Sequence, residues 1–379
     1  MAKKIILSLA ILYFIFATSC DVVQIANETN PKKRDSLEIY VFNVGEAMSQ
    51  LIISPTGKSI LIDCPESNWN SNTISKFIAS EIKRITGNTH INYIVASHLH
   101  LDHIGYVGYG GIWGLIEKEG ITCDVLLDRN AGKWIDYNDD KIPDYSNEIV
   151  YYNGGNLTNT AKRWICWVTD PRSKAGNIRQ IAKLDSTTQI DIGLSEGVIV
   201  KIVQVDGYGV KMTDNETSIS GDHTKESFPP SENDYSMTLW IKWNKFDYIF
   251  GSDTDGQYQK SPSYTYNDVE SIVAKKINQQ VEILNVNHHG AGYSSNNTYV
   301  TTLKPQVAIY QVGDNSYGHP EQRVLDLFYQ NNVDQYLTAM GDINRNYYNS
   351  VIVNGTILIK VAKNDSYTVN KKSYASLEP

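Results

Sequence analysis

Four side chains of metal-binding type lie within six residues of one another, in the segment His98-Leu99-His100-Leu101-Asp102-His103. Such a cluster is hard to bury without a cation, because each desolvated imidazole or carboxylate needs a partner. Side chains two positions apart tend to project the same way, so His98 and His100 can bind one cation. Asp102 and His103 then turn toward a second. The spacing therefore predicts a site for two divalent metal ions.

Two later segments offer further ligands at the ends of apolar strands. Asp253 follows Ile249-Phe250-Gly251-Ser252 and could bridge two cations. A surface turn containing Asp253 and Asp255 is the alternative interpretation. His288 and His289 precede a glycine that permits close backbone approach. We expect one imidazole of this pair to bind metal and the other to orient it or contact substrate, and the sequence leaves both assignments open.

His319 lies in a loop just before a helix that begins at a proline, so we expect its imidazole to face the same edge as the metal ligands. There it could protonate a leaving oxygen or stabilise a developing oxyanion. The alternative is a surface histidine that packs on the helix. Asp63, which ends an earlier apolar run, is expected to support the histidine-rich loop from behind rather than to bind metal.

The elements that must position these residues alternate between strands and helices. A hairpin is predicted over 49–62, a helix over 72–85, and a strand over 91–97 that delivers the histidine-rich loop. The pattern is clear again from residue 236, with strands at 236–243, 248–251 and 281–286 and a helix over 320–329. Residues 128–233 are interpreted as an insertion of loops and irregular strands. This alternation predicts packed layers, with helices outside two sheets.

Composition limits the function classes. The chain has 379 residues and a formal net charge of -8, so nucleic acid is possible as a partner but is not favoured. After Cys20, only Cys64, Cys123 and Cys166 remain, without C-x-x-C spacing. We therefore expect at most one disulfide bond and no zinc finger.

The N-terminus has the features of an export signal. Two lysines precede an apolar stretch over 5–16, and small residues then lead to Cys20. This order resembles a bacterial lipobox, which predicts a signal peptide over 1–20 and a lipid on Cys20 that anchors the protein to a membrane. A plain signal peptide and an uncleaved anchor are the alternatives. Residues 21–37 are interpreted as a polar linker, and residues 38–379 as the functional domain of an exported lipoprotein in the periplasm or at the cell surface.

A family resemblance rests on several motifs together. These are Val41-Phe42-Asn43-Val44-Gly45-Glu46, Leu61-Ile62-Asp63, the loop from Ser97 to Gly105, Asn233-Asp234-Tyr235-Ser236, Gly251-Ser252-Asp253, His288-His289-Gly290 and Gly318-His319-Pro320. The histidine-rich loop resembles that of the metallo-β-lactamase superfamily. The whole set resembles the β-lactamase-like domain of the competence protein ComEC and its soluble relatives over about residues 38–330. The resemblance implies an αββα sandwich of the α/β class, a dinuclear site at one edge, and hydrolysis of phosphodiesters.

The sequence departs from this family at two places. Relatives usually begin with Asp-Val-Gly-Gln-Gly-Asp, whereas Asn43 and Glu46 stand in this segment here. Many superfamily members also supply a third imidazole to the first metal, and the interval before Asp253 contains only His223. Asp128, at the end of an apolar strand, could substitute as an oxygen ligand. That substitution would shift the preference from zinc toward manganese.

The function that these features predict is hydrolysis by a hydroxide shared between two divalent cations, with zinc the favoured metal and Asp102, Asp253 and His319 as catalytic candidates. Phosphodiesters are the favoured substrates. Two alternatives stay open: a lactone or β-lactam hydrolase using the same hydroxide on a carbonyl group, and a surface lipoprotein that has lost turnover and binds a glycan through the tyrosines of the insertion.

Overall fold

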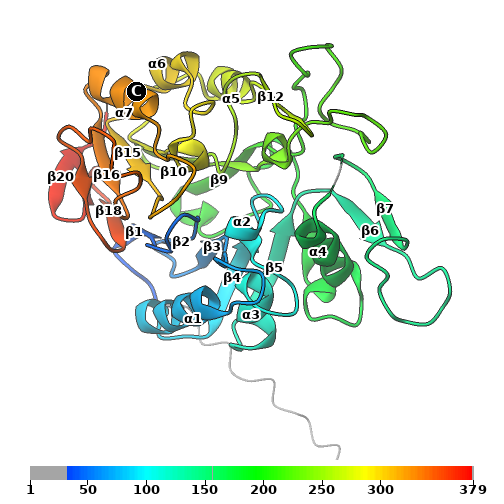
Figure 1. Ribbon diagram of the computed structural model, residues 1–379. Coiled ribbons are helices and arrows are strands. Elements are labelled where there is room, and N and C mark those ends of the chain that lie inside the picture. The colour runs from blue at the N-terminus through cyan, green and yellow to red at the C-terminus, as the bar shows by residue number, and fades with distance from the viewer. Residues whose placement is uncertain (1–31, 156, 378–379) are drawn as a thin grey trace, which may run out of the picture. The chain divides into compact units, whose positions relative to one another are not determined.

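Two mixed β-sheets carry the fold of the computed structural model, which describes residues 32–155 and 157–377 (Figure 1). The predicted signal peptide, Cys20 and the linker up to residue 31 lie outside these residues. The part from Lys32 onward is one compact unit.

The first sheet has nine strands. In spatial order they are β20 (Lys372–Ala375), β19 (Ser366–Val369), β18 (Ile357–Ala362), β1 (Ser36–Val41), β2 (Gln50–Ile53), β3 (Ser59–Ile62), β4 (His90–Val95), β5 (Thr122–Asp128) and β8 (Arg179–Ile181). The hairpin predicted over 49–62 is the antiparallel pair β2–β3. Beyond it, β3, β4, β5 and β8 run parallel, so the chain must cross over between them.

The second sheet has seven strands. In spatial order they are β17 (Val351–Ile352), β16 (Asp334–Leu337), β15 (Val307–Tyr310), β14 (Ile283–Asn285), β11 (Phe246–Phe250), β10 (Thr238–Trp243) and β9 (Val198–Gln204). Two short pairs stand apart, β6 (Gly132–Trp134) with β7 (Ile149–Tyr151) and β12 (Gln259–Lys260) with β13 (Thr265–Tyr266).

The side chains between and outside the sheets define four layers. Alternate apolar residues of β1 and β10, such as Ile39 and Ile241, share one buried cluster, so the two sheets pack face to face. A second cluster joins the outer face of the first sheet to α1 (Thr73–Thr86), α3 (Gly111–Glu117) and α4 (Asn159–Thr169). A third joins the outer face of the second sheet to α5 (Glu270–Ile277), α6 (Asn297–Leu303) and α7 (Gln322–Gln330). The predicted αββα sandwich is confirmed.

The interpretation of residues 128–233 as loops and irregular strands is wrong for one segment. α4 is a regular helix that covers the first sheet, and Thr158 caps it by accepting a hydrogen bond from the Ala161 amide. Its buried face carries Trp164 and Ile165. The signal was present in the sequence, because Ala161, Trp164, Ile165 and Val168 recur at helical spacing and are all buried.

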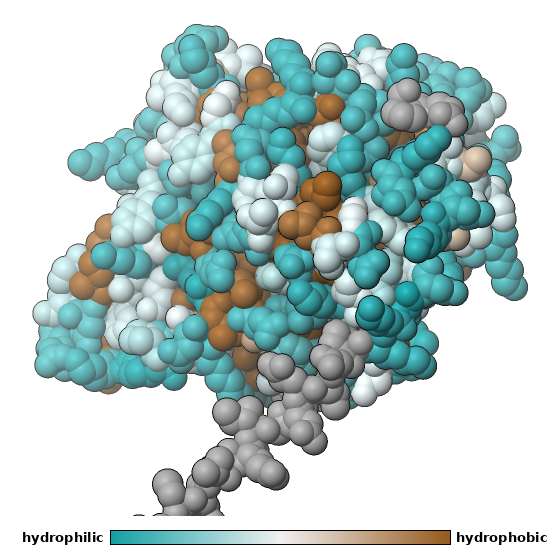
Figure 2. Space-filling model, turned by 180° about the vertical axis from the view of Figure 1, so that it is seen from behind, coloured by the Kyte–Doolittle hydropathy of each residue, from teal (hydrophilic) through white to brown (hydrophobic). Residues whose placement is uncertain are grey.

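Surface and covalent features complete the fold. Cys64, Cys123 and Cys166 are buried and unpaired, so no disulfide bond forms among the described residues. No helix in this part of the chain combines the length and the apolar character that a bilayer span requires. On the face seen in Figure 2, apolar side chains form separate patches among polar ones, as is normal for a protein surface.

Candidate metal centre

The histidine-rich loop leaves β4 and enters the short helix α2 (Leu101–Ile104), which carries Asp102 and His103. Asp63, at the end of β3, holds the loop from behind. Its carboxylate accepts hydrogen bonds from the Ser97 amide at 2.8 Å and the Ser97 hydroxyl at 2.6 Å, and it pairs with His103 Nδ1 at 2.8 Å. The carboxylate therefore fixes the ring of His103, so that Nε2 points the other way.

One cluster of four ligand-type residues forms around that nitrogen. It comprises Asp102, His103, Asp253 and His289, with one donor atom from each lying within 4.8 Å of all the others. His103 Nε2 lies 3.1 Å from Asp253 Oδ1, and His289 Nε2 lies 3.5 Å from Asp102 Oδ2. The ring of His289 is held on its other side, where Nδ1 hydrogen-bonds with the Gln311 carbonyl at 2.7 Å. The set has the mixture of imidazole and carboxylate donors that zinc accepts.

A second cluster shares Asp253 and contains His98 and His100. His98 Nε2 lies 3.9 Å from Asp253 Oδ2 and 3.0 Å from His100 Nδ1, while His98 Nδ1 hydrogen-bonds with the Ser252 hydroxyl at 3.2 Å. The structure thus brings together six of the predicted ligands, with Asp253 common to both clusters. The bridging position expected for Asp253 is the one that this geometry provides.

The second cluster has three donors, and the neighbouring groups are His288 and Asn233. His288 Nε2 lies 3.8 Å from Asp253 Oδ2, and the Asn233 amide lies 3.3 Å from the same nitrogen. Asn233 Oδ1 is buried without a hydrogen-bond partner. An amide oxygen is a donor that a divalent cation accepts, so Asn233 could supply the ligand that an additional imidazole supplies in many members of the superfamily that the histidine-rich loop resembles.

Asp128 and His223, the two residues considered for that role, contribute no atom to either cluster. Asp128 accepts hydrogen bonds from Trp164 Nε1 at 2.8 Å and Arg179 Nε at 2.8 Å. The His223 ring contacts the Ile219 carbonyl at 3.0 Å and Glu226 at 2.9 Å. Both side chains have their partners within the insertion and on the first sheet, so the expectation that either replaces the absent imidazole does not fit this structure.

The pair His288-His289 divides its tasks. His289 joins the four-residue cluster, whereas His288 Nδ1 pairs with Asp255 at 2.9 Å and its ring lies against Tyr293. Both residues have positive φ, 48° and 53°, which L side chains rarely adopt. Such strain is found where the surrounding structure holds a functional geometry, and here it turns both rings into one cavity.

His319 lies in the same cavity and is oriented by a residue that the sequence did not single out. Glu46 Oε1 pairs with His319 Nδ1 at 2.8 Å, and Glu46 Oε2 accepts from the Gly313 amide at 3.0 Å. The His319 ring lies nearly parallel to that of His289, with the ring centroids 6.2 Å apart. The peptide bond from His319 to Pro320 is cis. The sequence contained one signal for this contact, which was the acidic residue Glu46 that the first motif gains relative to the family pattern.

Burial and charge set the protonation of the centre. Burial acts to lower the pKa of His103, but the carboxylates of Asp253 and Asp63 outweigh it and raise that pKa well above its usual value. Burial acts to raise the pKa of Asp253, and His103, His288 and His289 together hold it well below its usual value. The centre therefore combines an ionised carboxylate with imidazoles that compete for positive charge.

Unsatisfied atoms test whether cations fit here. His103 Nε2, His289 Nε2 and Asp253 Oδ1 are all buried and have no hydrogen-bond partner outside the cluster, where they lie close only to one another and to Asp102. Buried polar atoms are normally satisfied, and each such exception needs an explanation. Three of them converge on one point, and each is a ligand atom, so the residues present fit a bound divalent cation.

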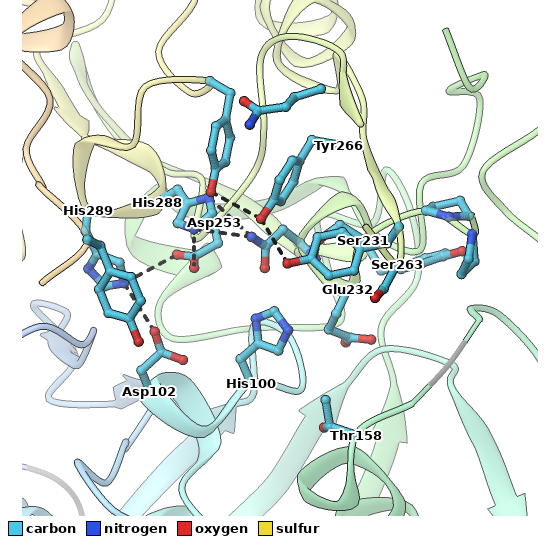
Figure 3. Close-up of a pocket in the computed structure, with 18 of the residues that line it drawn as sticks. His100, Asp102, Thr158, Ser231, Glu232, Asp253, Ser263, Tyr266, His288 and His289 are labelled. Atoms are coloured by element: carbon cyan, nitrogen blue, oxygen red, sulfur yellow. Dashed lines mark hydrogen bonds and ion pairs between the residues drawn. The ribbon is translucent and has the colours of Figure 1, made fainter. Parts of the chain in front are cut away.

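The clusters open into a cavity of about 920 Å³. In Figure 3, His100 and Asp102 lie on one side, with His288, His289 and Tyr266 opposite them. Thr158 at the start of α4, with Ser231 and Glu232 from the loop before β10, completes the walls. The insertion thus contributes directly to the cavity, and sequence reasoning missed this role.

Comparison with known proteins gives one curated relative, and no protein-family model matches the chain. The chain is 26% identical over 125 residues to ComE operon protein 3 of Bacillus subtilis, a match that covers 32% of this chain. It spans only 15% of the length of that relative.

Among solved structures, the metallo-β-lactamase fold protein YhfI of Bacillus subtilis aligns with a TM-score of 0.40 and 9% identity, over 80% of this chain and 96% of that one. CmlA, a diiron β-hydroxylase of Streptomyces venezuelae, aligns with a TM-score of 0.37 and 13% identity, over 79% of this chain and 51% of that one. The assignment of the fold rests on the four layers and the histidine-rich loop. The chain therefore has the αββα metallo-β-lactamase fold, and over part of its length it resembles ComE operon protein 3.

Proposed function

We propose that this protein is a hydrolase that uses two divalent cations, one in each cluster, and that its substrates are phosphodiesters. The observation that carries the proposal is the meeting of three buried ligand atoms, His103 Nε2, His289 Nε2 and Asp253 Oδ1, none of which has a hydrogen-bond partner outside the clusters, together with the place of Asp253 in both clusters. When bound, the two cations would lower the pKa of a water molecule between them and polarise the group under attack. The imidazole and carboxylate donors suit zinc, and an oxygen donor from Asn233 would favour manganese in the three-residue cluster.

The side chains of this chain have separable roles in that reaction. Asp253 would contribute a ligand to both cations, and Asp63, Gln311 and Ser252 orient the rings that face it. His319, oriented by Glu46, lies where it can exchange a proton with the leaving oxygen. Burial acts first to lower the pKa of His319, and its net pKa is below the usual value, so the ring is neutral at pH 7.

A second candidate function is hydrolysis of a carboxylic ester or lactone. It is favoured by the cavity walls, because the described residues that line the cavity include no lysine or arginine to bind phosphate oxygens. The same two clusters could serve either reaction. An assay therefore has to decide which kind of bond, a phosphodiester or a carboxylic ester, the protein cleaves. Bis(p-nitrophenyl) phosphate and a lactone panel should be measured side by side on one preparation.

The test of the proposal is Asp253→Asn, with metal content and hydrolysis both measured. We expect the wild-type chain to bind two divalent cations. The variant should lose at least one of them and at least ~100-fold in rate, because even residues that only orient ligands cost 10–100-fold. The matched control is His90→Gln, since His90 lies at the far end of β4 and its side chain is exposed. Unchanged metal content and unchanged rate in Asp253→Asn would refute the proposal.

We also propose export as a lipoprotein through Cys20, which lies outside the described residues. The order of charged, apolar and small residues before Cys20 supports it. Expression in a bacterium with labelled fatty acid should label the wild-type chain and leave Cys20→Ala unlabelled. Equal labelling of the two, or labelling of neither, would count against a lipid at this position.

A further inference from the structure

The cavity beside the two clusters has an unusual charge distribution for a site that acts on phosphodiesters. Its described lining includes five carboxylates and no lysine or arginine. The carboxylates are Glu46, Asp102, Glu232, Asp253 and Glu321. A protein that binds a nucleic acid backbone neutralises several phosphates with lysine and arginine side chains, and this term supplies most of its affinity.

Two guanidinium groups beside the cavity are already engaged with carboxylates of its lining. Arg129 pairs with Glu232 at 2.5 Å, and its side chain is fully buried. Arg345 pairs with Glu321 at 3.0 Å. Neither arginine lines the cavity, and each is already engaged with a carboxylate that does. Because no lysine or arginine is among the described residues that line the cavity, cations bound by the two clusters would supply most of the positive charge that a substrate meets there.

Aromatic rings line the rest of the cavity. Tyr266 stacks on Tyr293 with centroids 4.2 Å apart, and Tyr264 meets Tyr266 edge to face at 5.3 Å. On the other side of His288 and His289, Tyr317 stacks on His319 at 5.7 Å. Tyr264 and Tyr317 are 37% and 73% exposed, so each has a ring face that a ligand can reach.

Uncharged polar side chains complete this lining, among them Thr158, Gln257, Gln259 and Ser263. Figure 3 shows Thr158 and Ser263 across the cavity from His289. Hydroxyl and amide groups can exchange hydrogen bonds with a neutral ligand, whereas they cannot compensate several negative charges. The cavity thus surrounds a single charged centre with tyrosine rings, amides and hydroxyls. Such a lining is complementary to a ligand that has one anionic or polar group and uncharged rings.

We propose that the substrate of this site carries its scissile group next to an uncharged ring that stacks on Tyr264 or Tyr317, and that polyanions such as nucleic acids are not substrates. This inference rests on the proposed function, because it concerns the same cavity. The inference limits the expected phosphodiester substrates to small molecules with one negative charge. It applies equally if the substrate is a neutral lactone.

Equilibrium binding tests whether the site prefers a ligand with an aromatic ring, and it does not require turnover. Diphenyl phosphate and dimethyl phosphate carry the same single charge, and only the first has rings. We expect the metal-loaded full-length protein to bind diphenyl phosphate at least tenfold more tightly, because a stacked aromatic contact contributes a factor of about ten. In Tyr264→Ala/Tyr317→Ala this preference should fall to less than threefold. Tyr329→Ala is the matched control, since Tyr329 is 46% exposed, stacks on Tyr348 and does not line the cavity.

The salt dependence of oligothymidylate binding tests how many phosphates the cavity neutralises. A fluorescein-labelled oligothymidylate should bind weakly, with a slope of log affinity against log salt of about -0.7 or shallower, as for a single phosphate contact on a single strand. Gln259→Lys/Ser263→Lys adds two cations to the exposed rim and should tighten this binding and steepen the slope.

Two results would overturn the inference: equal affinity for the two phosphates, or oligothymidylate binding tighter than that of diphenyl phosphate with the slope of several contacts. Failure of the proposed function would look different. In that case the metal-loaded protein hydrolyses no ester, while it still binds diphenyl phosphate more tightly than dimethyl phosphate.

Discussion

The strongest test of how the centre is supported is removal of the Arg129 side chain. Arg129 donates to both oxygens of Glu232, through Nε at 2.7 Å and Nη2 at 2.5 Å, and Nη1 lies 3.5 Å from Asp206. The guanidinium also lies 4.5 Å from the ring of Tyr235. Glu232 Oε1 in turn accepts from the Leu99 amide at 3.0 Å, between His98 and His100. One buried arginine thus connects the insertion to the metal-binding loop.

The magnitude follows from what Arg129→Met leaves behind. The buried carboxylate of Asp206 and the largely buried carboxylate of Glu232, whose side chain is 10% exposed, lose their counter-charge, and burial already acts to raise the pKa of Asp206. Removing one partner of a buried ion pair costs about 3–5 kcal/mol. With an unfolding entropy of ~2.1 cal/mol/K per residue over roughly 350 residues, a loss of about 4 kcal/mol lowers Tm by about 5 °C.

The assay is thermal unfolding of the apo protein, followed by metal titration of the folded state. Arg84→Met is the matched control, because Arg84 is 62% exposed and pairs with Glu81 within one helix. We expect less than about 1 kcal/mol there. Because Glu232 anchors the Leu99 amide, Arg129→Met should also weaken metal binding at the His98–His100 cluster by about 10-fold or more.

A double-mutant cycle with Glu232→Gln separates the ion pair from general packing. We expect the double variant to lose less stability than the sum of the single variants, since neither charge is then left unpaired at this contact. If Arg129→Met unfolds at the same temperature as Arg84→Met, or if the two single effects simply add, the ion pair does not support the loop.

Two further predictions concern buried titratable groups that belong to neither metal cluster. Burial raises the pKa of Glu282 to about 7, above its value in the unfolded chain, so the stability of the protein should fall as pH rises from about 4 to 7. Urea unfolding between pH 5 and 8 measures this effect. Compared with wild type, Glu282→Gln should remove about 1–2 kcal/mol of the pH dependence of the unfolding free energy, allowing for solvent screening. Identical pH profiles of the two proteins would contradict a raised pKa of Glu282. Burial also raises the pKa of Cys123 and of Cys166 to about 12, and that of Cys64 well above its usual value. In a Cys20→Ser chain, all three thiols should react with a disulfide reagent ~100-fold more slowly in the folded state than in urea, and rapid labelling of the native protein would show that they are accessible.

Local spacing was sufficient for the parts of the centre that lie close together in sequence. The histidine-rich loop occupies six residues at the end of one strand, so its ligands had to meet wherever that strand ended. Asp253 and His289 were also recognisable, because both end apolar strands and parallel strands that neighbour each other bring their carboxyl ends to one edge. The alternation of strands and helices likewise indicated the layered fold.

Contacts between distant segments could not be read in this way. Glu46 orients His319 across 273 positions of sequence, and Arg129 reaches Glu232 across 103. The helix α4 does carry a helical period at Ala161, Trp164, Ile165 and Val168, but which sheet its apolar face covers depends on its neighbours in the core.

The sequence by itself determined which chemical groups are available and which strand ends present them, because ligand type and local spacing are properties of short segments. Only the tertiary structure decided that His289 rather than His288 joins the four-residue cluster, that Asp128 and His223 have other partners, and that tyrosines rather than lysines surround the centre. Those outcomes depend on the packing of two sheets and an insertion against each other, which no single segment specifies.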